Sequence, residues 1–185
     1  MTKSVGDHVY RESGMDNVIL GNVIKYACEA CGAKRVLIPN MGPLHRAIAH
    51  ALADKPARLV PQEVRFIRDH LGLSNIRFAE IMGVRPEQTS RWVKDDPIGV
   101  PAERFLRVLA TMGPELVAPD ESPKQEIGAR MTREVISAVE ENLKEVAREL
   151  AGMIVHLPAQ SSEARSIDIR LRRQTAGWTA EGAPN

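Results

Sequence analysis

LSNIRFAEIMGVRPEQTSRWVK, residues Leu73–Lys94, is the most informative stretch of this chain. Two short helices that cross sharply need a small residue where they touch and a glycine where the chain turns, and Ala79 and Gly83 meet both needs. Ser74 is a good N-cap for the first helix. Pro86 suits the first turn of the second helix, where its missing N–H costs nothing. The stretch therefore predicts a helix-turn-helix motif.

The apolar side chains of this stretch fall where they would face one small core. They are Phe78, Met82, Val84 and Trp92. Thr89 occupies a slot that usually holds an aliphatic side chain. A preceding helix at Pro61–Leu71 and a following helix at Pro101–Thr111 would complete the bundle. These flanking helices support the interpretation of the stretch as a helix-turn-helix motif. The alternative is a helical packing module that touches no DNA.

Polar and charged side chains remain on the outer face of the second helix, where they can reach base edges and phosphates. Asn75, the first residue of the first helix, is placed to touch phosphate or base. The predicted DNA-contacting residues are Asn75, Arg85, Glu87, Gln88, Ser90, Arg91 and Lys94. Over residues 61–112 the chain resembles the Cro/CI-type (XRE) family of repressors, which implies a lambda-repressor-like bundle.

Length and composition fit a small regulator. The chain has 185 residues, 43% of them hydrophobic, enough for one or two domains with an aliphatic core. The net charge of +1 means that DNA affinity would have to come from positioned charges in a dimer. No apolar run approaches the roughly 18 residues of a membrane span, and the N-terminus has no signal-like stretch. We therefore expect a cytoplasmic protein without a structural disulfide.

The only two cysteines stand in CEACG, as Cys28 and Cys31, among strand-like segments. Gly21-Asn22 between two of these segments suits a tight hairpin turn. A C-x-x-C-G after a strand has the form of a zinc knuckle, but a structural zinc site needs four ligands. The candidates for completing it are His8, His45 and His50, or the same pair from a second chain. The remaining alternative is a loop that keeps the form of a zinc knuckle but has reduced thiols and binds no metal.

A wider resemblance covers Tyr10 to Leu116, in the runs ESGMDNVIL, YACEACG, IPN and LHRAIAHAL followed by the helix-turn-helix. The chain is similar to zinc-finger plus helix-turn-helix antitoxins of the YgiT/MqsA type. That resemblance implies an N-terminal metal domain that can hold a partner ribonuclease toxin, and C-terminal helices that bind the operator as a dimer. It also implies base reading by Glu87 and Arg91. Antitoxins of this type carry two C-x-x-C pairs, and the first pair is missing here.

The C-terminal third contains two further patterns. A proline-rich linker precedes residues 131–157, where apolar residues at alternating spacings of three and four predict an amphipathic helix, either dimerising or packed on its own domain. Ser166 to Arg172 alternates apolar and polar residues, which is typical of a short strand, and such a strand could serve as an edge that pairs with another chain. Gln174 to Asn185 is rich in Gly, Ala and Pro and is expected to fray.

Together these patterns predict a mostly α fold, a helix-turn-helix bundle with a small β module before it and a helical extension after it. The expected divisions are 1–42, 43–117, 118–130, 131–157 and 158–185. We expect a homodimer that binds a palindromic operator in double-stranded DNA and regulates transcription, including its own. The alternatives are an antitoxin that neutralises a toxin and a protein-interaction adaptor that does not bind DNA. The sequence contains no set of residues typical of a catalytic site, so we expect no enzymatic activity.

Overall fold

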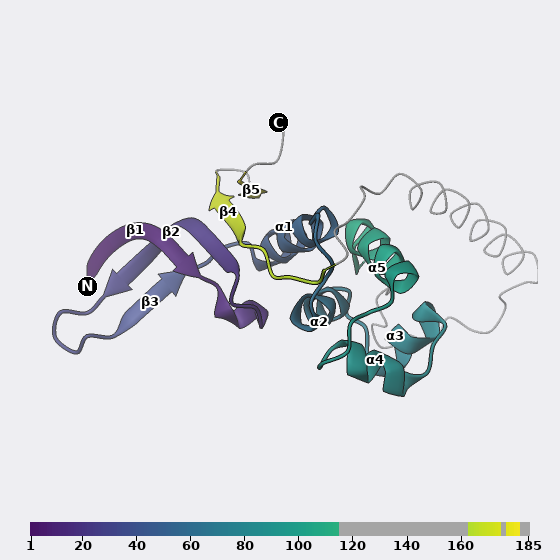
Figure 1. Cartoon of the computed structure of the whole chain (residues 1–185). Helices are drawn as coiled ribbons and strands as arrows, with labels where there is room; N and C mark the ends of the chain where they lie inside the picture. The colour runs from purple at the N-terminus through teal and green to yellow at the C-terminus, as the bar shows by residue number, and fades with distance from the viewer. Residues whose placement is uncertain (115–162, 175–176, 182–185) are drawn as a thin grey trace, which may run out of the picture.

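The computed structural model describes residues 1–114, 163–174 and 177–181. Figure 1 shows an elongated molecule with a strand-rich end, a helix-rich end, and β4, β5 and α1 between them. The predicted linker at 118–130 and the predicted amphipathic helix at 131–157 lie outside the described residues.

One mixed sheet joins the two ends of the described chain. Its five strands are β1 (Thr2–Val9), β2 (Val18–Ala27), β3 (Lys34–Leu37), β4 (Ile169–Arg173) and β5 (Trp178–Ala180). β1 pairs antiparallel along one side of β2. The other side of β2 is shared, because β4 pairs parallel with residues 18–21 and β3 pairs antiparallel with residues 24–27. β5 then extends the sheet beyond β4.

The prediction of a mostly α fold is wrong, because the sheet makes the fold mixed α/β. Two physical reasons explain the error. β1 is largely polar and mostly exposed, so it has no apolar alternation that could mark it as a strand. β4 does alternate, but its partner is remote: the Asn17 side chain donates to the Ile167 carbonyl, 150 positions along the chain, at 2.6 Å.

The hairpin turn predicted at Gly21-Asn22 is also wrong, because β2 runs through this point as one strand. The register with β1 shifts between the Gly6–Val23 pair and the His8–Leu20 pair, which marks a β-bulge. Asn22 has a φ of 63°, a conformation that Asn adopts more readily than most residues. The bulge lies where the shared side of β2 changes partner from β4 to β3.

The C-terminal strands are anchored by burial. Ile169 and Leu171 point into the core while Arg170 and Arg172 are exposed, so the alternating segment forms a strand within its own chain. Trp178 is buried in β5 and its Nε1 donates to the Pro39 carbonyl at 3.1 Å. Part of the tail expected to fray therefore belongs to the sheet.

Among the described residues, the helical end contains five α-helices and a short 3₁₀ helix. They are the 3₁₀ helix Arg11–Ser13, α1 (Met41–Ala53), α2 (Pro61–His70), α3 (Asn75–Met82), α4 (Pro86–Trp92) and α5 (Val100–Met112). The helices predicted on both sides of the central motif are thus confirmed as α2 and α5. α1 is central, since it contacts α2, α5, β4 and β5 and buries Leu44, Ile48 and Leu52.

A buried guanidinium connects three parts of the helical end. Arg107 of α5 is fully buried, and its Nη1 donates to the carbonyls of Leu52, Ala53 and Lys55 at 3.0, 2.8 and 2.7 Å. Its Nη2 donates to the Ala57 carbonyl and to Glu103 Oε1, at 2.7 and 3.0 Å. The last carbonyls of α1 have no hydrogen-bond partners within the helix. A cation at this position satisfies them and interacts favourably with the negative end of the helix dipole.

Two further ion pairs extend this buried cluster. Glu103 accepts from the Leu59 N–H at 2.9 Å and pairs with Arg58 Nε at 3.0 Å. Lys55 Nζ pairs with Glu63 at 2.6 Å, and Glu63 also accepts from the Val60 N–H at the start of α2. Burial raises the pKa of Glu63, while Lys55 and the Val60 N–H oppose that shift. The loop between α1 and α2 is therefore held by charge-assisted hydrogen bonds.

We expect Arg107→Met to lower the free energy of unfolding by about 3–5 kcal/mol, because it removes one of the two cations paired with the buried Glu103 and takes the donor from four backbone carbonyls. Chemical denaturation of the full chain measures this difference. Arg104→Ala is the matched control, since Arg104 lies on the same helix but is exposed. If both variants lost the same free energy of unfolding, the buried cluster would add no stability beyond that of the helix itself.

Candidate nucleic-acid interface

α3 and α4 form a helix–turn–helix unit whose ends are fixed by local hydrogen bonds. The Ser74 hydroxyl accepts from the Arg77 N–H at 3.2 Å, so Ser74 is the N-cap of α3. α3 ends at Gly83, whose φ of 65° favours glycine, and the Val84 N–H returns to the Ala79 carbonyl at 3.0 Å. Pro86 opens α4. The predicted caps and turn are thus confirmed.

The inner sides of α3 and α4 share one small core. Phe78, Ala79, Thr89 and Trp92 are buried, and Met82 and Val84 are half-buried against them. The Phe78 and Trp92 rings meet edge to face, with centroids 6.4 Å apart. Burial of both rings leaves the opposite side of α4 facing out.

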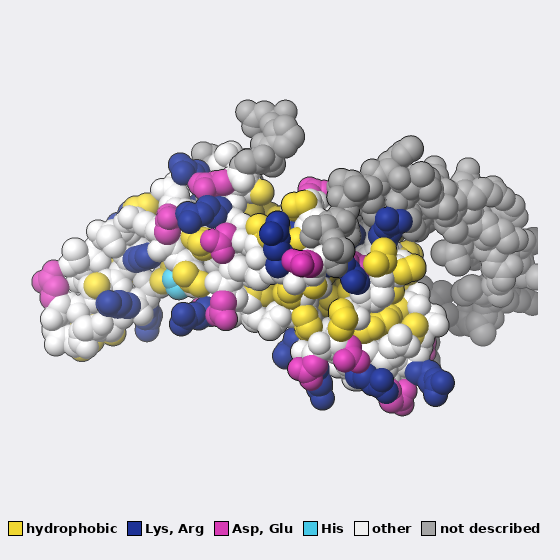
Figure 2. Space-filling view, in the orientation of Figure 1, with side chains coloured by type: hydrophobic (Ala, Val, Ile, Leu, Met, Phe, Trp, Pro, Cys, Tyr) yellow, Lys and Arg dark blue, Asp and Glu magenta, His cyan; other side chains and the backbone are white. Residues whose placement is uncertain are grey.

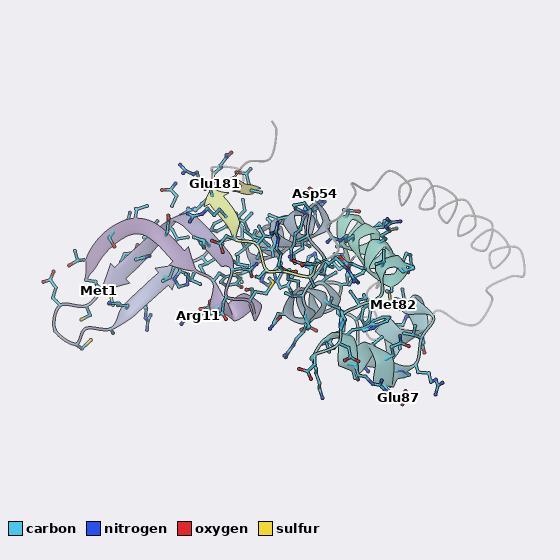
Figure 3. The ribbon with its side chains drawn as sticks, in the orientation of Figure 1. Met1, Arg11, Asp54, Met82, Glu87 and Glu181 are labelled. Carbon is cyan, nitrogen blue, oxygen red and sulfur yellow. The ribbon has the colours of Figure 1, made fainter. Side chains whose placement is uncertain are left out.

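That outer side carries most of the predicted DNA-contacting residues. Arg85, Glu87, Gln88, Arg91 and Lys94 are all exposed. Four of them, Arg85, Glu87, Gln88 and Arg91, line a shallow hollow of about 640 Å³ together with Trp92, Asp96 and Pro97. Figure 3 places Glu87 at the edge of the helical end, far from Met1 at the strand-rich end. These side chains can meet a large partner without any rearrangement of the backbone.

Asn75 and Ser90 are placed differently, because they are hydrogen-bonded to each other. Asn75 Nδ2 donates to Ser90 Oγ and to the Pro86 carbonyl, both at 3.0 Å. Asn75 Oδ1 accepts from Thr89 Oγ1 at 2.9 Å. The structure therefore uses the Asn75 carboxamide to join the start of α3 to the first turns of α4. No sequence pattern indicates this, because the two helices must already be packed for the contact to exist.

The charge around this unit is balanced. Residues 75–96 contain four basic and four acidic side chains, Arg77, Arg85, Arg91 and Lys94 against Glu80, Glu87, Asp95 and Asp96. Figure 2 shows the two signs interleaved on the visible face of this region. Arg77 pairs with Glu80 at 2.9 Å. Binding to a polyanion would therefore depend on individual contacts, since long-range attraction is weak.

Cys28 and Cys31 lie in the loop between β2 and β3, at the end of the sheet remote from the helices (Figure 1). The loop is closed by hydrogen bonds from the Cys28 N–H to the Ala33 carbonyl and from the Gly32 N–H to the Cys28 carbonyl, at 2.9 and 2.8 Å. Hydrogen bonds from Cys31 and from the Ala30 N–H lower the pKa of the Cys28 thiol.

The three histidines proposed to complete a metal site do not join these cysteines. His8 lies six residues along β1 from Thr2, which pairs with the last residue of β2, so it is about 20 Å from the loop. His45 and His50 lie on α1. Among residues 1–114, 163–174 and 177–181, no three His, Cys, Asp or Glu side chains gather where they could hold a metal ion.

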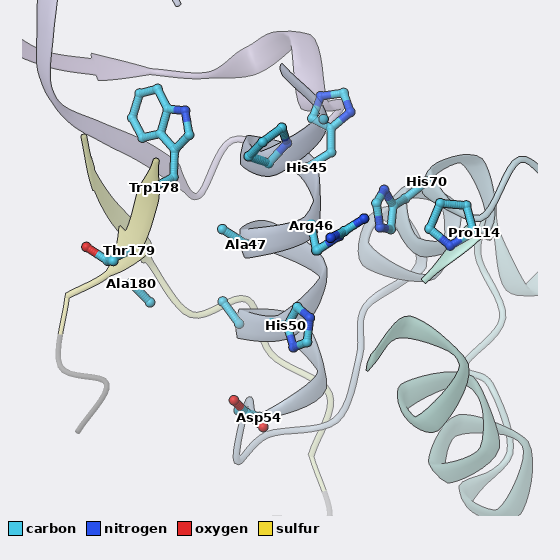
Figure 4. A pocket seen from close by; sticks show the side chains of 13 residues that line it. His45, Arg46, Ala47, His50, Asp54, His70, Pro114, Trp178, Thr179 and Ala180 are labelled. Carbon is cyan, nitrogen blue, oxygen red and sulfur yellow. The ribbon is translucent and has the colours of Figure 1, made fainter. Parts of the chain in front are cut away.

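A groove that the sequence did not indicate follows α1. It has a volume of about 740 Å³ and is bordered by His50 and Asp54 on the helix, Trp178 on one flank and Pro114 on the other (Figure 4). His45 also borders it, and the Tyr10 hydroxyl lies 3.0 Å from His45 Nε2. Burial lowers the pKa of His45 and, with Glu12, raises the pKa of Tyr10. Local sequence patterns do not predict this groove, because β5 forms one of its walls and is remote from α1 in the sequence.

Comparisons of the chain with protein-family models, curated proteins and solved structures found no match. The resemblance to YgiT/MqsA-type antitoxins therefore stays a prediction. Within the described part of the chain, no helix has the length and apolar character needed to cross a bilayer.

We expect Asn75→Ala to lower the free energy of unfolding by about 1–2 kcal/mol, because it removes the hydrogen bonds that join α3 to α4. Urea denaturation measures this loss. Ile76→Ala is the control, since Ile76 is the next residue and is 63% exposed. If both variants were as stable as the wild type, the Asn75 carboxamide would not hold the two helices together.

Proposed function

We propose that this chain is a sequence-specific DNA-binding protein that regulates transcription, with α4 as the helix that enters the major groove. The main support for the proposal is that the two sides of α4 have different roles. Its inner side chains and the Asn75 carboxamide fix the position of the helix, while Arg85, Glu87, Gln88 and Arg91 remain exposed beside one another. A rigid helix with exposed polar groups is what direct reading of base edges requires.

The exposed groups differ in what they would recognise. The guanidinium of Arg91 suits guanine O6 and N7, the amide of Gln88 suits adenine, and the carboxylate of Glu87 suits the amino group of cytosine. Arg85 is the N-cap of α4 and Lys94 follows its C-cap Val93, so contacts from these two residues to phosphates would set the register of the helix on the duplex. Ser90 is engaged with Asn75, so its part in this scheme is to position α4.

One such unit would bind weakly, because α4 has only seven residues and the surrounding charge is balanced. Two copies on a palindromic operator, with half-sites about one helical turn apart, would combine their contacts. We therefore propose a homodimer as the form that binds the operator. Repression of its own gene is the simplest regulatory use of such a site.

We expect Arg91→Ala to weaken specific binding by about 1–3 kcal/mol and to relax the base preference at one position in each half-site. DNA selected from a random library by the wild-type protein supplies the operator, and fluorescence anisotropy at fixed salt measures the affinity. Binding to unrelated DNA should fall much less.

Arg172→Ala is the matched control for this variant. Arg172 is an exposed arginine on β4 that pairs with Glu181, away from α4. It should leave operator affinity unchanged. Wild-type specific affinity in a folded Arg91→Ala protein would remove α4 as the reading helix, and failure of the wild type to select any sequence would overturn the proposed function itself.

A further inference from the structure

The loop between β2 and β3 has the shape of half a metal site. Cys28 and Cys31 stand at the two sides of one tight loop, and Gly32 takes a φ of 71° that lets the chain turn back toward β3. Hydrogen bonds from the Cys28 N–H to the Ala33 carbonyl and from the Gly32 N–H to the Cys28 carbonyl close the loop, at 2.9 and 2.8 Å. This closure keeps both cysteines within one tight turn. The loop is thus arranged to offer two thiolates to one ion.

The ligand count shows what is missing. Structural zinc takes four ligands in a tetrahedron, and the chain has only two cysteines. The described part of the chain brings no third ligand to them. A single copy therefore does not fit the closed four-cysteine site that the antitoxin resemblance implies. The loop is nevertheless accessible, because Cys31 is exposed and the loop projects from the end of the sheet.

We propose that two copies of this chain meet at this loop and hold one zinc ion between them, bound by Cys28 and Cys31 of each copy. Two identical loops related by a two-fold axis supply a complete tetrahedron of thiolates. Thiolates select zinc over the harder divalent ions magnesium and calcium. This proposal is independent of DNA binding, since the loop and α4 lie at opposite ends of the molecule (Figure 1).

The test uses the full chain, purified with a phosphine reductant, loaded with zinc and freed of excess metal by gel filtration. Elemental analysis gives zinc per chain, and light scattering gives the particle mass before and after a chelator. We expect half a zinc per chain, and we expect removal of the metal to halve the particle mass. Cobalt(II) in place of zinc should give the visible absorption of a tetrahedral thiolate site, saturating at half an equivalent.

Two variants make the result specific to the loop. Cys28→Ser should lose the metal, the cobalt spectrum and the zinc-dependent change in mass together. Glu29→Gln, a change in the same loop that leaves both thiols in place, should keep all three. One zinc per chain, a particle mass that does not depend on zinc, or a protein that retains no zinc would each overturn the proposal. Operator binding measured on the same samples reports separately on the proposed function.

Discussion

The buried guanidinium of Arg107 is the contact on which the helical end depends. A cation inside an apolar core is costly unless every donor is satisfied, and here five acceptors surround it. Those acceptors come from the end of α1, the following loop and α5. Glu103 then carries the same connection to Arg58 and Leu59. The network fixes where α2 begins, and α2 in turn packs against α4.

This arrangement bears directly on the proposed DNA binding. The side chains proposed to read DNA lie on a short helix, which is marginal on its own in water. α4 is held from inside by Phe78 and Trp92, from its start by Asn75, and from behind by α2. Its outer face therefore needs no stabilising role and is free to carry charged and polar groups. A reading helix gains specificity from such rigidity, because exposed side chains then approach the bases from a fixed backbone.

Local signals were informative in the helix–turn–helix unit. Ser74, Gly83 and Pro86 have the roles that their residue types predict, because a cap or a turn involves only near neighbours. Asn75 shows the limit of this reasoning. Its position at the start of a helix suggested contact with DNA, but its partners Thr89 and Ser90 become visible only when α3 and α4 are packed.

The sheet shows the same limit on a larger scale. The alternation at Ile169 and Leu171 indicated a strand but not its partner, and β1 lacked even an alternation. Asn22 was expected to reverse the chain, yet its positive φ serves a bulge that lets β2 continue. A residue type fixes which backbone angles are accessible, whereas the pairing of neighbouring strands decides whether those angles produce a turn or a bulge.

The parallel pairing of β2 with β4 also has a consequence for synthesis of the protein. While a ribosome makes the chain from the N-terminus, β1, β2 and β3 emerge long before residues 169–173 exist. During that interval one side of β2 keeps its backbone groups unpaired beside the apolar residues Val18 and Leu20, which β4 later helps to cover. An open strand edge of this kind invites pairing with other nascent chains. Completion of the sheet is therefore a late, non-local step, and its rate sets how long the growing chain stays exposed to misassembly.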